Sequence, residues 1–330
     1  MPIRFSAKAV HNLSISAGCI VGFLLMEMVI APAPAQACFY WQECAQQRGQ
    51  ASNTRGGGKR TGLILGGNDA TVPYVITPRN AWIGQQSLPE KIRWNAVEDI
   101  SDYTVRIWQW TYGRDAARRI LWQESVSERN EIAFPELPLQ LGIYYSVEVM
   151  TAEGVSSNLD EGYYQSGFQL LAEQDYELAR TQAEQVGEEI APTAEEAALA
   201  QASVYFLAEM YADALHILET LLPNTNSSES ANASDLVYIA LGDTYSATGL
   251  NQLSIEAYEE ALALSITNED APSTAITQVS LADVHIRLGE FETAKTLLIA
   301  ARETYQQLDA QTEVAWLNQR ISLFEPSNAL

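Results

Sequence analysis

The chain has 330 residues, 47% of them hydrophobic, which is enough length and apolar content for two globular domains. Its formal net charge of −23 disfavours nucleic acid and anionic membranes as binding partners. Residues 160–330 hold 28 Asp and Glu against five Lys and Arg, so this part should attract basic partners or serve solubility alone.

Residues 1–37 are organised like a secretory signal peptide. Basic residues precede the apolar run ISAGCIVGFLLM, and Ala35-Gln36-Ala37 provides an A-x-A cleavage site. Glu27 interrupts the apolar stretch, which argues against the alternative of an uncleaved, membrane-spanning anchor. We therefore predict export to the periplasm or the extracellular space, with no spanning helix in the mature chain.

Cleavage after Ala37 would leave Cys38 and Cys44 as the cysteines of the mature chain. In an oxidising compartment these two thiols could form a disulfide. The alternative for Cys38 is a lipid anchor, although the preceding Ala35-Gln36-Ala37 departs from the Leu-small-small pattern of bacterial lipoprotein signals at its first two positions. This region contains no His, and we predict neither a metal site nor a cofactor.

Residues 38–72 have the composition of a basic, glycine-rich linker. Three consecutive glycines, Gly56–Gly58, stand among Arg55, Lys59 and Arg60, which is typical of flexible connections. A phosphate-binding loop is the alternative, but it requires Ser or Thr directly after Gly-Lys, and Arg60 occupies that position.

Residues 73–154 show the two-residue period of β-strands. Apolar side chains alternate in three runs, at Ile92 and Trp94, at Tyr103, Val105 and Ile107, and at Tyr145, Val147 and Val149. Turn residues separate the runs at a spacing typical of sandwich strands, so we predict an all-β sandwich here.

Two segments of this region resemble a fibronectin type III domain. They are the early Pro-x-x-Ile-x-Trp strand that ends at Trp94 and the late segment LQLGIYYSVEV, in which Leu141 replaces a Pro of the family. The resemblance implies that Trp94 is a core residue and that Tyr145 forms a corner. Trp108, Trp110 and Tyr112 have the opposite parity from Tyr103, so we expect an outward aromatic surface that docks on the second domain or, alternatively, stacks on a sugar.

Residues 155–330 have helical periodicity arranged in copies. Within Asp235–Ser265, one apolar stripe precedes Gly249 and a second follows it, and together they comprise Tyr238, Leu241, Gly242, Tyr245, Ser254, Tyr258, Ala261 and Leu262. A copy lies forty residues later, and another lies forty residues earlier with Glu209 at the turn-glycine position. A weaker, fourth copy starts near Asp160, at Gly167, Leu170 and Ala179.

These offsets resemble the tetratricopeptide repeat, although Ile266 replaces the family's closing Pro. The resemblance implies an all-α array of three or four helical hairpins whose concave face binds protein or peptide partners. The matching groove positions are Ile239, Asp243, Ser246, Val279, Asp283 and Arg287. Many members of the family hold a terminal carboxylate with Lys and Asn, and the acidic Asp243 and Asp283 depart from that pattern. We therefore predict a basic or amphipathic partner.

The sequence offers little for catalysis, and we predict that the protein is not an enzyme. His11 lies in the signal, His216 has no Cys and no carboxylate–His spacing beside it, and His285 occupies a packed position of the repeat. The function that we expect is an exported, non-catalytic scaffold or adaptor of the cell envelope. The alternatives are a glycan-binding or adhesion module that uses the aromatic surface, and an accessory regulator of an envelope protease. The partner's identity and the oligomeric state stay open.

The signal prediction has a direct test. Protein recovered from the envelope should have an intact mass that corresponds to a chain starting at Cys38, because the A-x-A site follows the apolar run. A mass that retains the first 37 residues would contradict cleavage, and an added diacylglycerol would favour the lipid anchor.

Overall fold

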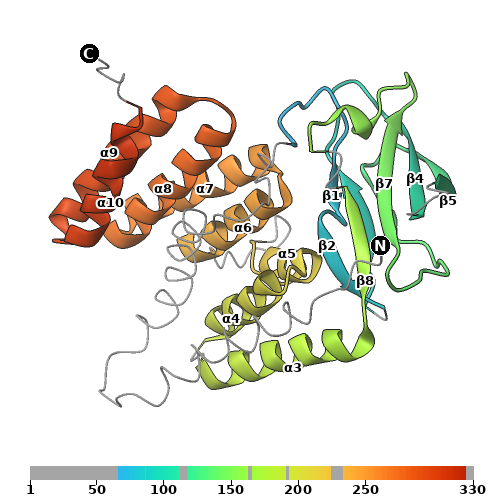
Figure 1. Cartoon of the computed structure of the whole chain (residues 1–330), viewed down its shortest axis with the longest axis horizontal. Coiled ribbons are helices and arrows are strands. Elements are labelled where there is room, and N and C mark those ends of the chain that lie inside the picture. The colour runs from blue at the N-terminus through green and yellow to red at the C-terminus, as the bar shows by residue number, and fades with distance from the viewer. Residues whose placement is uncertain are drawn as a thin grey trace.

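The computed structural model describes residues 66–85, 87–111, 117–162, 166–190, 193–223 and 233–324. The predicted signal, Cys38, Cys44, most of the predicted linker and Tyr112 lie outside these ranges. The chain forms a β-rich part and an array of helices that lie side by side (Figure 1). No helix of the described ranges has the length and apolar content needed to cross a membrane.

The N-terminal part consists of two β-sheets. The three-stranded sheet has the order β1-β3-β6 and the five-stranded sheet the order β2-β8-β7-β4-β5, in which β2 and β8 are parallel and the other pairs are antiparallel. The strands are β1 (Val75–Thr77), β2 (Ala81–Gly84), β3 (Lys91–Trp94), β4 (Asp102–Thr111), β5 (Ala117–Ser127), β6 (Glu131–Ala133), β7 (Tyr144–Thr151) and β8 (Gly167–Leu171).

Both sheets contribute side chains to one hydrophobic core. These side chains are the apolar residues that alternate along the predicted strands. Trp94 of β3 is fully buried and packs edge-on against Tyr103 of β4, with ring centroids 5.5 Å apart. Tyr145 of β7 is also fully buried, stacks on Phe168 and accepts a hydrogen bond at its hydroxyl from the backbone N–H of Gln140. The inward parity predicted for these strands is therefore present in the structure.

The sheet extends beyond the predicted domain boundary at residue 154. Strand β8 lies within the segment that was expected to start a fourth helical repeat, but it pairs with β2 and β7 instead. Gly167 and Leu170 are therefore strand residues, whereas Ala179 lies in the first helix of the array. The fourth copy is not a hairpin, because a strand stands where its first helix would be.

The C-terminal part is an array of antiparallel helices. Three hairpins, α4–α5, α6–α7 and α8–α9, are preceded by α3 and followed by α10 in the described residues. The helices are α3 (Glu173–Ile190), α4 (Ala194–Leu207), α5 (Tyr211–Thr220), α6 (Asp235–Thr248), α7 (Asn251–Thr267), α8 (Ala271–Arg287), α9 (Phe291–Gln307) and α10 (Gln311–Ser322).

The turns inside the hairpins use one backbone conformation. Gly249 ends α6 with φ +75°, and Gly289 follows α8 with φ +77°, the left-handed region that glycine adopts without a steric penalty. Glu209 occupies the same position between α4 and α5 with φ +60°, at the place where the sequence lacks the turn glycine. The first hairpin therefore keeps the turn geometry despite its non-glycine residue.

A close crossing of α6 and α7 explains Gly242. A Cβ atom built on Gly242 would lie 2.5 Å from ring carbons of Tyr258, and Ser254 donates a hydrogen bond of 2.8 Å to the Gly242 carbonyl oxygen. The ring of Tyr258 therefore rests directly on the backbone of α6. Small residues at these positions permit the approach of the two helices, as the repeat pattern predicts.

The junction between the two parts is built around the buried Arg79. Its Nε donates to the carbonyl oxygen of Thr248 at 2.8 Å, and its Nη2 contacts Asp160 Oδ2 at 3.1 Å. Nη1 and Nη2 also donate to the carbonyl oxygens of Val75 and Gly162. This one side chain thus joins the β-rich part to the turn between α6 and α7.

Replacement of Gly242 by Leu should destabilise the protein. The added side chain must displace the ring of Tyr258, and such overpacking costs about 1–3 kcal/mol. A lower melting temperature than wild type in thermal unfolding checks this expectation. Glu256→Leu, at an exposed position of α7, is the matched control and should leave the melting temperature close to that of wild type. An unchanged melting temperature for Gly242→Leu would contradict the crossing.

Candidate functional site

The predicted groove lies along the first helices of successive hairpins, where α6 contacts both α4 and α8. Ile239 is only 2% exposed and belongs to the hydrophobic core, so its prediction as a groove residue is wrong. The other five predicted positions, Asp243, Ser246, Val279, Asp283 and Arg287, are half-buried on α6 and α8. The structure therefore brings most of the predicted groove residues onto two neighbouring helices.

Polar contacts connect these residues from one helix to the next. Arg287 of α8 donates from Nη2 to Ser246 Oγ of α6 at 2.6 Å, and Arg320 of α10 pairs with Asp283 of α8. The hydroxyl of Tyr258 donates to Asp243 Oδ1 at 2.6 Å, and burial raises the pKa of Tyr258 well above its ordinary value. The two groove carboxylates thus both have partners in the folded chain.

Arg287, a predicted groove residue, is therefore joined by a second basic residue, Arg320, beside these carboxylates. Arg320 lies 37 residues beyond Asp283 in the sequence and in a helix outside the recognised copies. It approaches Asp283 because α10 packs against α9 at the end of the array. Asp283 nevertheless keeps 41% of its side chain exposed in this pair, so a partner could still reach it.

Many other carboxylates of the array lie on its outer helices. Glu256, Glu259 and Glu260 are exposed on α7, and Glu292 and Glu303 are exposed on α9. Residues 160–330 contain only five basic residues, and two of them, Arg287 and Arg320, contact polar residues of the groove. The outer surface of the array therefore retains most of the negative charge. The electrostatic field of the array thus surrounds the groove and is not confined to it.

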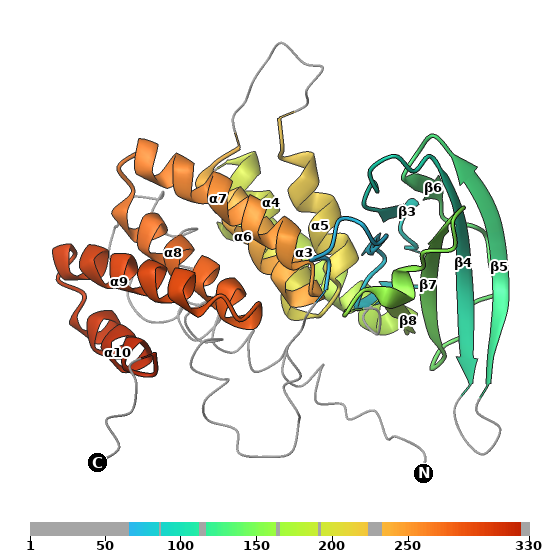
Figure 2. The same cartoon turned by 90° about the horizontal axis from the view of Figure 1, so that it is seen from above.

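Strand β4, which carries Trp108 and Trp110 of the predicted aromatic surface, lies on the side of the β-rich part away from the helices (Figure 2). Trp108 and Trp110 are half-buried on β4, with parity opposite to the buried Tyr103, as predicted. The indole N–H groups donate to Glu148 Oε2 and Ser146 Oγ, both at 2.8 Å, and the Arg118 guanidinium lies 4.4 Å from the Trp108 ring centroid.

The preferred interpretation of these aromatics, docking on the helical part, is wrong. The helices instead approach the opposite edge of the five-stranded sheet, where α5 and α3 contact β2. The backbone N–H of Trp82 donates to the carbonyl oxygen of Glu209 at this edge. Sequence parity could identify which face the aromatics occupy, but not which edge of the sheet the array covers.

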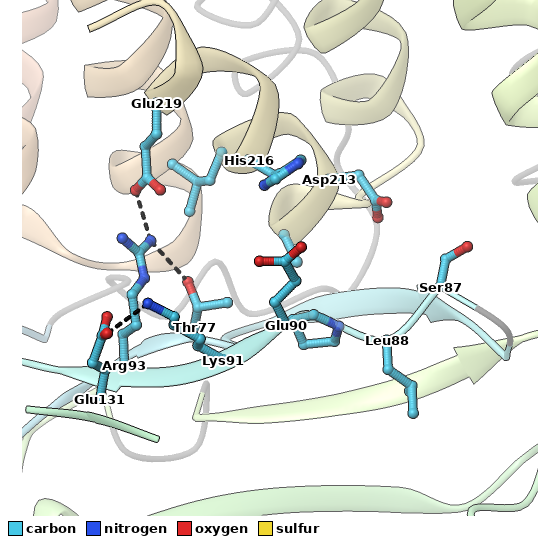
Figure 3. A pocket seen from close by; sticks show the side chains of 13 residues that line it. Thr77, Ser87, Leu88, Glu90, Lys91, Arg93, Glu131, Asp213, His216 and Glu219 are labelled. Carbon is cyan, nitrogen blue, oxygen red and sulfur yellow. Dashed lines mark hydrogen bonds and ion pairs between the residues drawn. The ribbon is translucent and has the colours of Figure 1, made fainter. Parts of the chain in front are cut away.

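A cleft of about 400 Å³ separates β3 and the loop before it from α5. Figure 3 shows that the acidic side chains of Glu90 and Asp213 and the imidazole of His216 point into it from its two walls. The other wall residues are Thr77, Ser87, Leu88, Pro89, Lys91, Arg93, Glu131, Ala212, Leu215 and Glu219. This cleft could not be predicted from the sequence, because β3 and α5, which form its walls, are more than a hundred residues apart.

Two ion pairs hold one end of the cleft. Arg93 Nη2 lies 2.6 Å from Glu219 Oε1, which joins β3 to α5, and Lys91 Nζ lies 2.5 Å from Glu131 Oε1 (Figure 3). Tyr245 of α6 also donates to Glu219, at 3.3 Å. The Arg93 pair and the Arg79 cluster therefore attach the same two parts of the molecule at separate places.

Asp213 is the titratable group that this cleft perturbs most clearly. Burial raises the pKa of its carboxyl to about 6, although a hydrogen bond from the Tyr176 hydroxyl and the nearby His216 oppose the increase. The Tyr176 oxygen lies 3.1 Å from Asp213 Oδ1. Within the described residues, no group of three or more His, Cys, Asp or Glu is arranged to hold a metal ion.

The comparisons with known proteins concern the helical part. The family model for the tetratricopeptide repeat matches residues 233–307, which span α6 to α9. This match confirms the repeat prediction for these two hairpins and identifies them as an element typical of protein–protein interaction. No curated protein matches the chain.

Asp213→Asn should stabilise the protein at neutral pH. The folded-state pKa of about 6 exceeds the ordinary value of 3.8, so the carboxyl contributes no penalty below pH 3.8, and its destabilising effect develops between pH 3.8 and 6 and is complete above pH 6. The shift corresponds to about 2–3 kcal/mol, and Asn keeps an acceptor for Tyr176. Urea unfolding should show the variant to be more stable than wild type at pH 7.5, and this difference should be clearly smaller at pH 4.5. Glu303→Gln, at an exposed carboxylate of α9, is the control; equal stability of Asp213→Asn and wild type at both pH values would contradict the prediction.

Proposed function

We propose that the protein is an exported, non-catalytic scaffold of the cell envelope that binds a basic or amphipathic protein segment along the groove of its helical array. The observation that carries this proposal is the tetratricopeptide match at residues 233–307 on helices whose first members lie side by side. Export rests on the signal-like segment at residues 1–37, and the absence of enzymatic activity rests on the absence of a recognisable catalytic motif in the sequence.

The groove combines polar and apolar side chains in a way that suits an amphipathic segment. Val279 and Ile286 are half-buried apolar residues on α8, and Asp283 on the same helix is 41% exposed. An amphipathic helix in a groove places its apolar anchors against apolar side chains and its charges at the rim. The exposed carboxylates of α7 and α9 would draw a basic partner towards the array before contact.

We also propose that the β-rich part is a fibronectin III-like sandwich. Its support is the strand order of the two sheets, the buried Trp94 on an early strand and the hydrogen bond from the backbone of Gln140 to the Tyr145 hydroxyl. In such a role this part would orient the array and extend its interaction surface. The contacts of Arg79 and Arg93 with the helical part hold it in one orientation.

A groove variant tests the function. The immobilised chain should retain a partner from envelope extract, and mass spectrometry identifies it. With that partner purified, Asp243→Asn/Asp283→Asn should slow association about fivefold at low salt, because opposite charges accelerate encounter, and moderate salt should reduce the difference.

The control is a matched pair of neutralised carboxylates on the outer side of α7. Glu259→Gln/Glu260→Gln removes the same charge at exposed positions and should slow association less than the groove variant. Thermal melting establishes that both variants are folded. Equal association rates for wild type and the groove variant, with equal salt dependence, would show that the groove does not bind the partner.

A further inference from the structure

The two edges of the five-stranded sheet differ in what covers them. Helices α5 and α3 contact β2 at one edge, where Trp82 donates its backbone N–H to Glu209 at 3.2 Å. At the other edge, β5 pairs with β4 and with no other strand of the described chain. Strand β5 is eleven residues long, and an open edge of this length is a template for pairing with another strand.

An irregularity in β5 changes which of its side chains share a face. Trp122 is opposite Ile107, but Ile120 is opposite Trp108, so Leu121 is an extra residue at this point. Arg119 therefore lies opposite the buried Gln109, and Glu124 lies opposite the buried Val105. Arg119 and Glu124 are five positions apart, and an odd separation places two residues of a regular strand on opposite faces. Because of the extra residue, both lie on the same face of the sheet.

We propose that β5 is a self-association site at which the occupant is the β5 strand of a second copy, paired antiparallel about a twofold axis between Leu121 and Trp122. In this register Arg119 of each copy is opposite Glu124 of the other. At the centre, Leu121 of each copy is opposite Trp122 of the other and Ile120 is opposite Gln123, and Ile120 is 46% exposed in the single chain. Opposite charges on the same face flank this centre on both sides, so the edge is complementary to itself.

The distribution of charge agrees with this choice of partner. Residues 1–159 contain equal numbers of acidic and basic residues, whereas the net charge of −23 falls on the rest of the chain. Contact between two helical arrays would therefore be repulsive. Strand β5 lies on the side of the β-rich part away from the helices (Figure 2), so pairing at this edge keeps the two arrays at opposite ends.

Charge reversal tests the proposed register. Sedimentation equilibrium of the full chain should show a monomer–dimer equilibrium. Arg119→Glu and Glu124→Arg should each weaken association about tenfold, because each creates two like-charge contacts by symmetry. The double variant Arg119→Glu/Glu124→Arg should restore association to near the wild-type level, since the opposite charges are exchanged.

Matched controls for net charge lie on α3. Arg180→Glu and Glu184→Arg reverse two exposed side chains that pair within one helix at 2.9 Å, far from β5, and should leave the dimer constant unchanged. A chain that stays monomeric at all concentrations, single reversals at positions 119 and 124 without effect, or a double variant that fails to recover would each overturn the proposal. Circular dichroism establishes that the variants are folded.

Discussion

The ion pair between Arg79 and Asp160 is the contact on which the arrangement of the molecule depends. Both side chains are almost fully buried, and burial lowers the pKa of Arg79 while Asp160 opposes that effect. A charge removed from water is tolerated when its hydrogen bonds are satisfied, and loss of one partner then costs several kcal/mol. The other acceptors of Arg79 belong to Val75, Gly162 and Thr248, so correct placement of three distant segments is required to satisfy one guanidinium.

The helical array shows a second use of arginine, at its inner side. Arg287 and Arg320 each extend from one helix to a polar group of the preceding first helix, and these contacts cross between hairpins. Packing of small residues, as at Gly242, sets the distance within a hairpin, whereas these polar contacts connect neighbouring hairpins. The acidic groove that the sequence predicts is therefore partly neutralised by the chain itself.

The parts of the structure that the sequence predicts well are those with a local period. Alternation in Tyr103, Val105 and Ile107 and the helical offsets around Gly242 depend on neighbours within one or two elements, and both patterns are present. Strand β8 was missed because five residues, GFQLL, are too short to distinguish a strand from the start of a helix. Its pairing with β2, from a segment more than eighty residues earlier, decides the outcome.

The candidate sites differ in the same way: residues placed by the repeat offsets could be predicted, whereas contacts set by the tertiary fold could not. Repeat offsets located Asp243 and Asp283, but the contact of Asp283 with Arg320 depends on how α10 packs, which no offset in the recognised copies encodes. The cleft around Asp213 was missed for a similar reason, because β3 and α5 meet only through the tertiary fold. Its altered pKa comes from burial between these walls and has no signature in the neighbouring sequence.

The place of β8 has a consequence for dissecting the protein into fragments. A cut near residue 154, where the composition changes from β-like to helical, would leave β8 attached to the array and expose the edges of β7 and β2. A cut after Leu171 would preserve the sheet, but it would separate the Arg79 guanidinium from Thr248 and uncover the surface that α5 occupies. Neither fragment reproduces the surfaces of the intact chain, so a fragment that retains both folded parts must include the segments that carry both Arg79 and Thr248.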